Sequence, residues 1–379
     1  MSRSIAYLDY NATAPLRSAA AATMAEAACI GGNPSSLHRQ GRLARRAVED
    51  ARAKIAALVG ARPAELIFTG GGTEANNLAL GVPVDRVLCS SIEHASVLQA
   101  ASAAATEIVP VDPDGIIDLA ALATMLARGS GRTLVSVMLA NNETGAIQPL
   151  AEVAALVRRH DALLHADAIQ AFGKIAVDAS ALGIDLLSLS AHKIGGPQGV
   201  GALVLREGVA LRPQQLGGGQ ELGRRAGTEN VAGIVGFAAA AEAAFAQWPA
   251  LAALAEWRDE LEATLRARVP DLTVWSQAAP RLPNTSCISM RGVSSETQLI
   301  AFDLAGFAVS AGAACSSGKI APSHVLRAMG ADATEAGSAV RISLGWATTP
   351  AEVRRFAEAW LQLWARLARQ PLARDPAAC

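Results

Sequence analysis

Lysine is rare in this chain: only four of the 33 basic residues are lysines, Lys54, Lys174, Lys193 and Lys319. Unlike arginine, lysine can lose its proton and form a Schiff base with an aldehyde. Lys193 follows the apolar run Ile184–Ser190 and precedes a Gly-Gly-Pro turn, so we expect burial to lower the pKa of its amine. Lys54 lies in an arginine-rich amphipathic segment, Lys174 follows a Phe-Gly turn and Lys319 lies in a Ser-Gly loop. Lys193 is therefore the best Schiff-base candidate.

Two further segments have the composition of a ligand site. Gly70-Gly-Gly-Thr-Glu74 follows an apolar run and opens a helical pattern, so backbone N–H groups and a helix N-terminus converge there. This predicts a phosphate cradle, with an ordinary glycine-rich turn as an equal alternative. Asp167 ends another apolar run, and ligands gather at the carboxyl ends of strands in open α/β sheets. A helix N-cap is the alternative for Asp167.

A phosphate cradle, an acidic residue and a Schiff-base lysine at neighbouring strand ends are what pyridoxal phosphate requires. The phosphate anchors the cofactor, the lysine holds its aldehyde, and the carboxylate keeps the pyridine nitrogen protonated as an electron sink. The order of these segments along the chain matches that of fold-type I pyridoxal-phosphate enzymes.

The five cysteines are scattered, odd in number and without C-x-x-C spacing, which argues against a disulfide framework and a zinc ribbon. Cys315 lies among Ala, Gly and Ser, with no bulky neighbour to bury it, so it is the nucleophile candidate. Lys319 favours its thiolate if the loop brings the two together. We expect Cys89 and Cys287 to be buried. With no apolar signal core at the N-terminus, the sequence predicts a cytoplasmic protein.

The pattern of elements predicts where these residues lie. Short apolar runs alternate with helical segments up to about residue 250, which indicates an α/β layer with a mostly parallel sheet. A smaller α+β domain follows, and strand Ile5–Asp9 folds back onto one of the two domains. The predicted strands are 66–69, 86–90, 133–140, 162–166, 184–190, 200–205, 285–290 and 340–344. The predicted helices are 44–59, 73–81, 95–104, 150–160, 230–246, 251–269 and 351–369.

Length and composition exclude several classes of protein. The 379 residues exceed what one hydrophobic core usually holds, and 51% hydrophobic against 18% charged residues excludes a disordered chain. A net charge of −1 offers no basic field for nucleic acid. The most apolar stretch, Val231–Ala246, is short, rich in alanine and interrupted by Glu242, so it predicts a buried helix and no membrane span.

The whole chain resembles the NifS/IscS-like cysteine desulfurases, a class-V aminotransferase group of fold-type I pyridoxal-phosphate enzymes. The resemblance rests on many sequence blocks that occur in the family's order. These blocks are Tyr7–Pro15, Gly32–His38, Thr69–Asn77, Glu93-His94, Asn141–Gly145, His165–Asp167 with Gln170, Ser190–Lys193, Gly217–Glu221, Arg225–Asn230, Ser310–Gly318 and Val340–Gly345.

The resemblance implies cofactor-binding roles for residues in these blocks. Lys193 would carry the internal aldimine, Asp167 would pair with the pyridinium nitrogen, and Gln170 would bond the ring hydroxyl. Asn142 would lie beside the ring, and His94 would stack on it and move protons. The phosphate would be held by Gly72, Thr73, Ser190 and His192, joined by Thr228 of a partner subunit.

The resemblance also implies the reaction, the conversion of L-cysteine to L-alanine through a ketimine of pyridoxal phosphate. Cys315 would attack the substrate sulfur and leave as a persulfide, while Arg341 and Asn11 would bind the substrate. The sulfur would pass to an acceptor such as an iron–sulfur scaffold protein. No intrinsic metal site is implied, beyond a transient iron–sulfur ligand role for Cys315.

The implied fold has a large cofactor-binding domain, residues 14–255. Residues 1–13 and 256–379 would form a smaller domain that carries the cysteine loop. We expect a homodimer, with no direct contact to nucleic acid or membrane.

Other functions stay open at this point. A selenocysteine lyase or an aminotransferase would share the fold, and a non-catalytic sulfur carrier could keep it. Two departures from the family's pattern bear on the choice. Trp346 stands where many relatives carry arginine. The chain ends soon after its last helix, so an iron–sulfur scaffold protein as the sulfur acceptor stays an open question.

Overall fold

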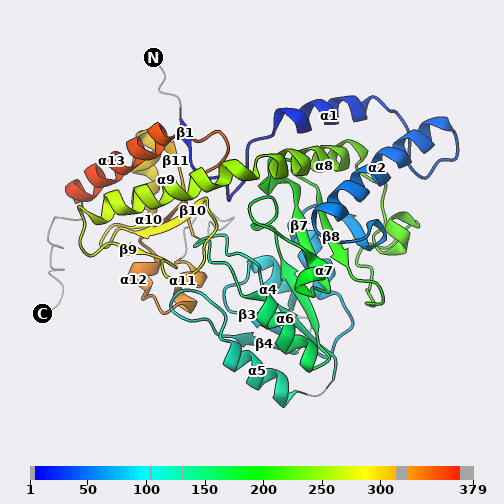
Figure 1. Cartoon of the computed structure of the whole chain (residues 1–379), viewed down its shortest axis with the longest axis horizontal. Helices are drawn as coiled ribbons and strands as arrows, with labels where there is room; N and C mark the ends of the chain where they lie inside the picture. The colour runs from blue at the N-terminus through cyan, green and yellow to red at the C-terminus, as the bar shows by residue number, and fades with distance from the viewer. Residues whose placement is uncertain (1–4, 102–104, 130, 313–321, 368–379) are drawn as a thin grey trace, which may run out of the picture.

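The computed structural model of the chain describes residues 5–101, 105–129, 131–312 and 322–367. At its centre is a seven-stranded sheet (Figure 1). Neighbouring strands are parallel except around β8, which runs antiparallel to both β7 and β2. In spatial order the strands are β2 (Leu66–Thr69), β8 (Gly201–Leu205), β7 (Leu186–Ser190), β6 (Leu163–Asp167), β5 (Thr133–Ser136), β3 (Arg86–Ser90) and β4 (Ala105–Val109).

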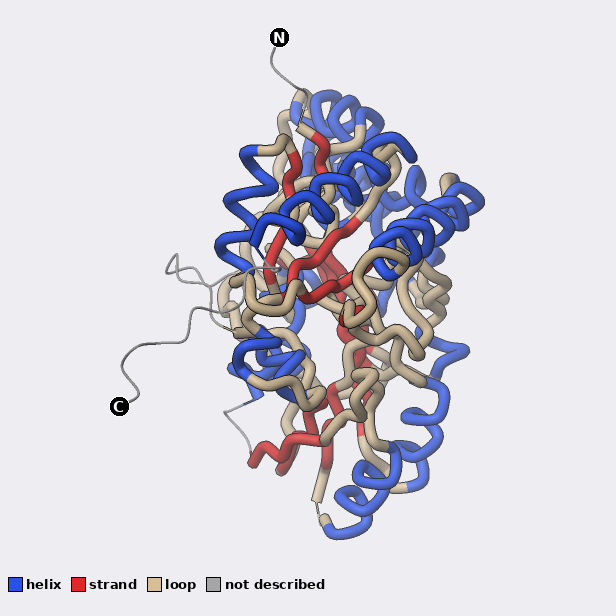
Figure 2. Tube along the Cα trace, turned by 90° about the vertical axis from the view of Figure 1, so that its left-hand side faces the viewer, coloured by secondary structure: helices blue, strands red, loops and turns tan. Residues whose placement is uncertain are grey.

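Helices cover both faces of this sheet, which explains why its strands read as continuous apolar runs (Figure 2). Successive residues of a strand point to opposite faces: Leu187 joins the core beneath α2, α6 and α8, and Leu186 joins the core beneath α3 and α4. The helices of this part are α1 (Ser18–Ala28), α2 (Arg39–Leu58), α3 (Gly72–Leu80), α4 (Ala95–Ala101), α5 (Leu119–Arg128), α6 (Leu150–Arg159), α7 (Ala179–Leu182) and α8 (Val231–Ala246), with short 3-10 turns η1 (Pro63–Glu65), η2 (Ala191–Lys193) and η3 (Gln220–Gly223).

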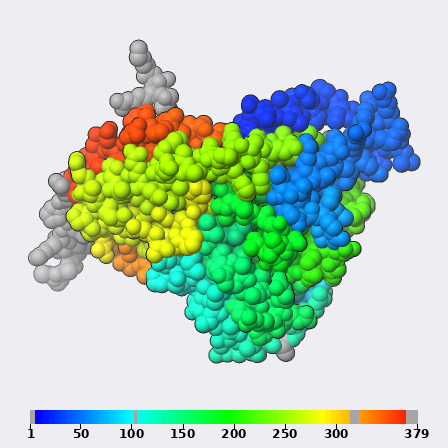
Figure 3. Space-filling view, viewed as in Figure 1, coloured from blue at the N-terminus to red at the C-terminus, as the bar shows by residue number. Residues whose placement is uncertain are grey.

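A second, smaller layer has its own core. Its antiparallel sheet is β12 (Ser310–Ala311), β13 (Ala339–Ser343), β10 (Thr285–Ser289) and β9 (Thr273–Val274), in that order. Trp360, Phe356 and Phe302 fill the core against this sheet. The helices are α9 (Trp248–Arg266), α10 (Ser295–Leu304), α11 (His324–Ala328), α12 (Ala333–Ala336) and α13 (Pro350–Leu367). In the space-filling view, α9 forms a band that runs from this layer to the end of α8 (Figure 3).

The start of the chain belongs to both parts. β1 (Ala6–Tyr7) pairs in parallel with β11 (Phe307–Ala308) of the smaller layer, with Ala6 opposite Phe307. The chain then crosses to the large sheet, where Ala14 N donates to His192 O at 2.9 Å. Residues 9–13 therefore lie between the two sheets.

The α/β class and its mostly parallel sheet are confirmed. The strand expected at 133–140 ends at Ser136, although Val137 N and Leu139 N still donate to β6 carbonyls. The helix expected at 251–269 starts three residues earlier, because Trp248 and Pro249 form its first turn. The sequence analysis missed strand β4, because its residues are mostly exposed and form no apolar run.

Among the described residues, no single helix is long and apolar enough to cross a membrane. Helices α8 and α9 pass this test only when they are taken together, by length and composition alone, and the chain bends by 68° between them.

A buried ion pair ties α2 to the loop that follows β8. Arg52 Nη1 and Nη2 bind the two carboxylate oxygens of Glu221 at 2.7 and 2.9 Å, and both side chains are less than a tenth exposed. Glu221 also accepts from Phe68 N, and its own φ is +48°. The pair thus holds an unfavourable backbone conformation beside the end of β2.

We predict that Arg52→Leu lowers the free energy of unfolding by about 3 kcal/mol or more, because it leaves the Glu221 carboxylate buried without its cation. The matched control is Lys54→Leu on the same helix, whose pair with Glu242 is half exposed on both sides and costs less than about 1 kcal/mol. Denaturant unfolding of both variants measures the difference. Equal losses would contradict the prediction.

Candidate active site

A cleft of about 560 Å³ opens at the carboxyl ends of the large sheet's central strands. It is lined from the large sheet by the ends of β6 and β7 and the start of α3, and from the smaller layer by β12 and β13. Almost every residue predicted for the site lines it: Asn11, Gly72, Thr73, His94, Asn142, Asp167, Gln170, Ser190, His192, Lys193 and Arg341.

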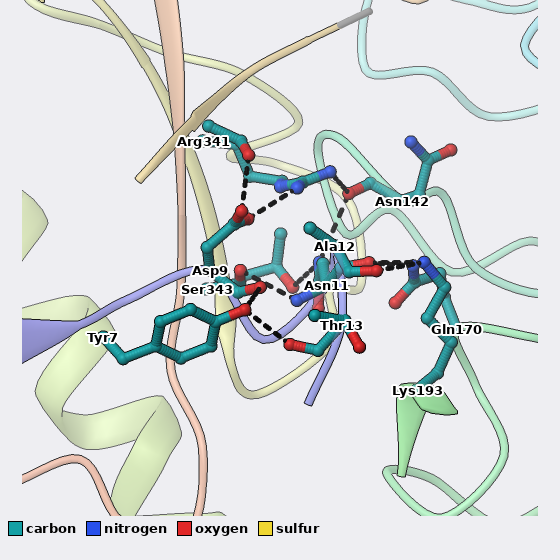
Figure 4. Close-up of polar contacts among 12 residues, drawn as sticks. Tyr7, Asp9, Asn11, Ala12, Thr13, Asn142, Gln170, Lys193, Arg341 and Ser343 are labelled. Carbon is teal, nitrogen blue, oxygen red and sulfur yellow. Dashed lines mark hydrogen bonds and ion pairs between the residues drawn. The ribbon is translucent and has the colours of Figure 1, made fainter. Parts of the chain in front are cut away.

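Lys193 lies in the short turn η2, directly after β7. Its Nζ donates to Asn11 O at 2.9 Å and to Ala12 O at 2.8 Å (Figure 4). Burial, and then the nearby charge of Arg341, lowers the pKa of the Lys193 amine to about 8. The amine is thus far more available near neutral pH than that of an ordinary lysine.

Asp167, at the end of β6, is held by two donors. Asn76 Nδ2 donates to Asp167 Oδ2 at 2.8 Å, and Ile169 N donates to Oδ1 at 2.9 Å. Burial raises the pKa of the Asp167 carboxyl, and these two hydrogen bonds lower it. The sequence analysis did not single out Asn76, although it belongs to the Thr69–Asn77 block.

The same Asn76 amide reaches His94 through Ser96. Asn76 Nδ2 donates to Ser96 Oγ at 2.9 Å, and Ser96 Oγ lies 2.8 Å from His94 Nδ1. Ser96 N also donates to His94 Nδ1, at 3.1 Å. Because a backbone N–H can only donate, Nδ1 carries the lone pair and the neutral imidazole has its proton on Nε2. Burial lowers the pKa of His94, which favours this neutral form.

The glycine turn before α3 has the properties of an anion cradle. Gly71 has φ +148° and ψ −178°, a conformation essentially restricted to glycine. A Cβ on Gly72 would approach Ile169 Cδ1 to 2.3 Å and Ser190 Cβ to 3.3 Å, so only glycine leaves the floor of the cleft open. Ser190 Oγ is buried and has no hydrogen-bond partner in the part of the chain that the structure describes. His192 lies beside it, with Nδ1 3.2 Å from Thr13 Oγ1.

Thr228 does not join this cluster. It is exposed and lines a separate hollow with Arg225 and Glu229, near the end of β2. Its predicted role belongs to a second subunit and stays a prediction.

Arg341 is buried in β13 and bridges two segments of the cleft. Its Nη2 pairs with Asp9 Oδ1 at 2.8 Å, and its Nη1 donates to Asn142 O at 3.0 Å (Figure 4). Its Nε makes no hydrogen bond to any described residue. A surface ion pair, the alternative for this residue, is excluded by its 5% exposure.

Asn11 lines the cleft, and its predicted role in substrate binding stays a prediction. Its Nδ2 donates to Thr285 Oγ1 and Asn142 O, and its Oδ1 accepts from Lys174 Nζ and Asn284 Nδ2. An amide offers two donors and two lone pairs, so this side chain is fully used. Substrate binding by the Asn11 amide would require one of these bonds to break.

The sequence analysis assigned no role to Lys174, but in the structure its side chain contacts two residues of the cleft. Its Nζ donates to Asn11 Oδ1 at 2.7 Å and to Gln170 Oε1 at 2.8 Å. Burial, with Lys193 and Arg341 nearby, holds the pKa of Lys174 well below the usual range. Gln170 is thus shared, because its Nε2 donates to Asn11 O while its Oε1 binds this lysine.

Two buried acids lie near the cleft: Glu143 lines it, and Glu93 directly precedes His94. Glu93 Oε1 accepts from Met138 N at 2.6 Å, Glu93 Oε2 has no partner among the described residues, and burial raises the pKa of this carboxyl. Glu143 Oε2 accepts from Ser323 Oγ at 2.5 Å. Gly312 and His324, on either side of residues 313–321, both line the cleft.

Cys315 and Lys319 lie outside the described residues, so the role of Cys315 as nucleophile stays a prediction. Cys89 and Cys287 are buried as expected, and burial raises the pKa of both thiols. The imidazole of His165 is fully buried, with Nδ1 2.8 Å from Ser136 Oγ and Nε2 2.9 Å from Ser188 Oγ. Within the described ranges, no three His, Cys, Asp or Glu side chains group as metal ligands.

The chain resembles known proteins over nearly its whole length. Residues 6–356 match the family model of aminotransferase class-V. The chain is 44% identical over 366 residues to a cysteine desulfurase of Cereibacter sphaeroides, covering 93% of this chain and 94% of that protein. It is 40% identical over 387 residues to an IscS-like cysteine desulfurase of Mycobacterium tuberculosis, covering 97% and 98%. A solved NifS-like protein from Rickettsia africae superposes with a TM-score of 0.88 at 33% identity, over 95% of this chain and 99% of that one.

The contact between Asn76 and Asp167 gives a prediction with a definite sign. Asn76→Ala removes a hydrogen bond that favours the ionised carboxyl, so the pKa of Asp167 rises further and the carboxylate is lost at a higher pH on acidification. We expect the acid limb of pyridoxal-phosphate binding to move up by about one pH unit, the scale of one charge-assisted hydrogen bond.

Binding measured by cofactor absorbance across pH tests this shift. Asn77→Ala is the control, because Asn77 Nδ2 donates to Thr73 O and Ser96 O and not to Asp167. An acid limb that moves equally in both variants would assign the effect to α3 as a whole.

Proposed function

Because the chain belongs to the aminotransferase class-V family, we propose that it is a pyridoxal-phosphate-dependent cysteine desulfurase, which converts L-cysteine to L-alanine and passes the sulfur to an acceptor. The observation that carries this function is the single cleft that holds Lys193, Asp167 and Arg341 together, at the strand ends of a fold shared with these relatives.

The residues of the cleft fit pyridoxal phosphate. The unpartnered Ser190 Oγ, the glycine turn Gly70–Gly72 and the N-terminus of α3 suit its phosphate. The buried carboxylate of Asp167 suits a protonated ring nitrogen, and the amine of Lys193 suits its aldehyde. The cofactor supplies an electron sink for the negative charge that forms when the substrate Cα loses its proton.

The chain's own residues supply binding and proton transfer. Arg341 binds the substrate carboxylate through its planar fork, and its unpartnered Nε is one donor for this task. The Lys193 amine takes the Cα proton and later returns one. The neutral His94, with its proton on Nε2, donates to the reacting groups.

Cys315 then accepts the sulfur. Its thiolate attacks the sulfur of the bound cysteine, an S–S bond forms, and the C–S bond breaks with its electron pair left on the substrate carbon. The protonated carbon product is alanine, and Cys315 holds the sulfur as a persulfide. Gly312, three residues before Cys315, lines the cleft, which supports this assignment.

The finer assignments also belong to this proposal. We place the enzyme in the cytoplasm as a homodimer in which Thr228 completes the partner's phosphate site. Its exposed position, away from the cleft of its own subunit, supports this. An iron–sulfur scaffold protein is the proposed acceptor.

The lowered pKa of Lys193 predicts how the cofactor-free protein captures pyridoxal phosphate. Capture needs the neutral amine, so its rate rises with pH up to about 8 and levels off above it. An ordinary lysine, with a pKa of about 10.4, would continue to gain rate above pH 9. Stopped-flow absorbance measures the rate, and borohydride reduction with mass spectrometry identifies the modified lysine. Capture retained in Lys193→Ala, or a profile that keeps rising, would reject the assignment.

The assignment of Cys315 predicts a separation of two properties. Cys315→Ser keeps the bound cofactor and its absorbance, but forms neither persulfide nor alanine from L-cysteine. The control Cys29→Ser changes an exposed cysteine, and it keeps both the bound cofactor and the formation of persulfide and alanine. Alanine is measured by chromatography and the persulfide by mass spectrometry. Normal alanine formation by Cys315→Ser would overturn the persulfide route, and selenocysteine cleavage by that variant would favour a lyase.

A further inference from the structure

A second cavity, of about 240 Å³, lies behind the catalytic lysine. Lys193 lines both this cavity and the cleft. The partition between the two includes Asn11 and Gln170, which line the cleft, and Lys174, which lines the cavity and donates to both of them. One water needs about 10–15 Å³ by this measure, so the cavity has room for an organic molecule.

The wall on the large-sheet side carries one buried guanidinium, that of Arg17. Arg17 is buried, with Nε donating to Ile194 O and Nη1 to Gln247 Oε1, both at 2.7 Å. Its guanidinium stacks on Trp346, with Cζ 3.7 Å from the ring centroid. The Lys174 amine, whose pKa burial holds well below its usual range, donates to the amide oxygens of Asn11 and Gln170.

The described residues that line the cavity include neither an Asp nor a Glu, so none of them places a carboxylate beside the Arg17 guanidinium there. Burial lowers the pKa of Arg17 to about 10, which reflects the cost of holding a guanidinium among neutral partners. An anion in the cavity would lower that cost.

The opposite wall is apolar and comes from the smaller layer. Leu251, Leu254 and Trp257 of α9 face the cavity, together with Leu344 after β13, whereas Trp346 lies on the Arg17 side, next to Gly195. Ala250 and Gln247, at the junction of α8 and α9, are exposed and mark its opening. The cavity thus offers charge at one side and aliphatic and indole surfaces at the other.

We propose that this cavity is a binding site for a small organic anion with an apolar body, such as a medium-chain monocarboxylate. The carboxylate binds N–H donors of the Arg17 guanidinium, and the apolar body packs against Leu251, Leu254 and Trp257 of α9. This site is separate from the substrate site, where Arg341 provides the carboxylate ligand.

The experiment measures hexanoate binding to the cofactor-loaded enzyme by isothermal titration calorimetry. Hexanamide, which has the same length and no charge, is the matched ligand. We expect saturable one-to-one binding of hexanoate and at least tenfold weaker binding of hexanamide, because the charged head makes charge-assisted hydrogen bonds.

Four variants locate the site. Arg17→Gln removes the cation, and Ala253→Phe fills the cavity from α9 without a change of charge; each is expected to weaken hexanoate at least tenfold. Lys54→Met, an exposed lysine on α2, leaves binding unchanged. Arg341→Lys also leaves it unchanged, because the anion does not occupy the cleft.

Three outcomes would overturn the proposal. These are no binding at concentrations up to about 10 mM, equal affinity for hexanamide, and a loss of binding in Arg341→Lys with none in Ala253→Phe. Ala253→Phe keeps the test decisive if Arg17→Gln fails to fold. The test is independent of desulfurase activity, because it reads binding alone.

Discussion

The hydrogen bonds of Asn11 are the constraint on which the site depends. Its backbone N donates to Ser343 Oγ and its side chain binds Thr285 and Asn284, all from the smaller layer. Its carbonyl accepts from Lys193 Nζ, which follows a strand of the large sheet. One buried residue thus connects β13, which carries Arg341, to the turn that carries Lys193. A displacement of either layer would break several of these bonds at once, so the two halves of the cleft are held in register.

Among the described residues, Ser190 Oγ and Arg341 Nε find no hydrogen-bond partner, and both residues line the cleft. Each such buried atom costs about 1–3 kcal/mol when it is left unsatisfied. In the proposed function, a phosphate and a substrate carboxylate would be their acceptors. The fold therefore holds donors in place before the ligands arrive, which is how preorganised sites stabilise charge without reorganisation. The hydrophobic cores beneath the two sheets support this arrangement.

The sequence was sufficient for residues whose role follows from their position on a strand. Lys193 and Asp167 end apolar runs, and the carboxyl ends of parallel strands meet at one edge, so their meeting was predictable. Lys174 was not, because its burial comes from the N-terminal segment that folds over it, more than 160 residues away in sequence. Asn76 shares a helix with Asn77, and only the orientation of α3 decides which of the two faces Asp167. The full use of the Asn11 amide likewise depends on partners from both layers, which no local pattern reveals.

Burial acts on the two central groups of the cleft in opposite directions, and their neighbours decide the result. Desolvation favours the neutral form of both, so it lowers the pKa of Lys193 and raises that of Asp167. For Lys193 the nearby guanidinium of Arg341 adds to the effect, and the pKa of the amine falls to about 8. For Asp167 the donors Asn76 and Ile169 oppose the effect in part, although the pKa of the buried carboxyl stays above its ordinary value. Burial thus brings the two pKa values closer together than they are in water, and the surrounding donors and charges decide by how much.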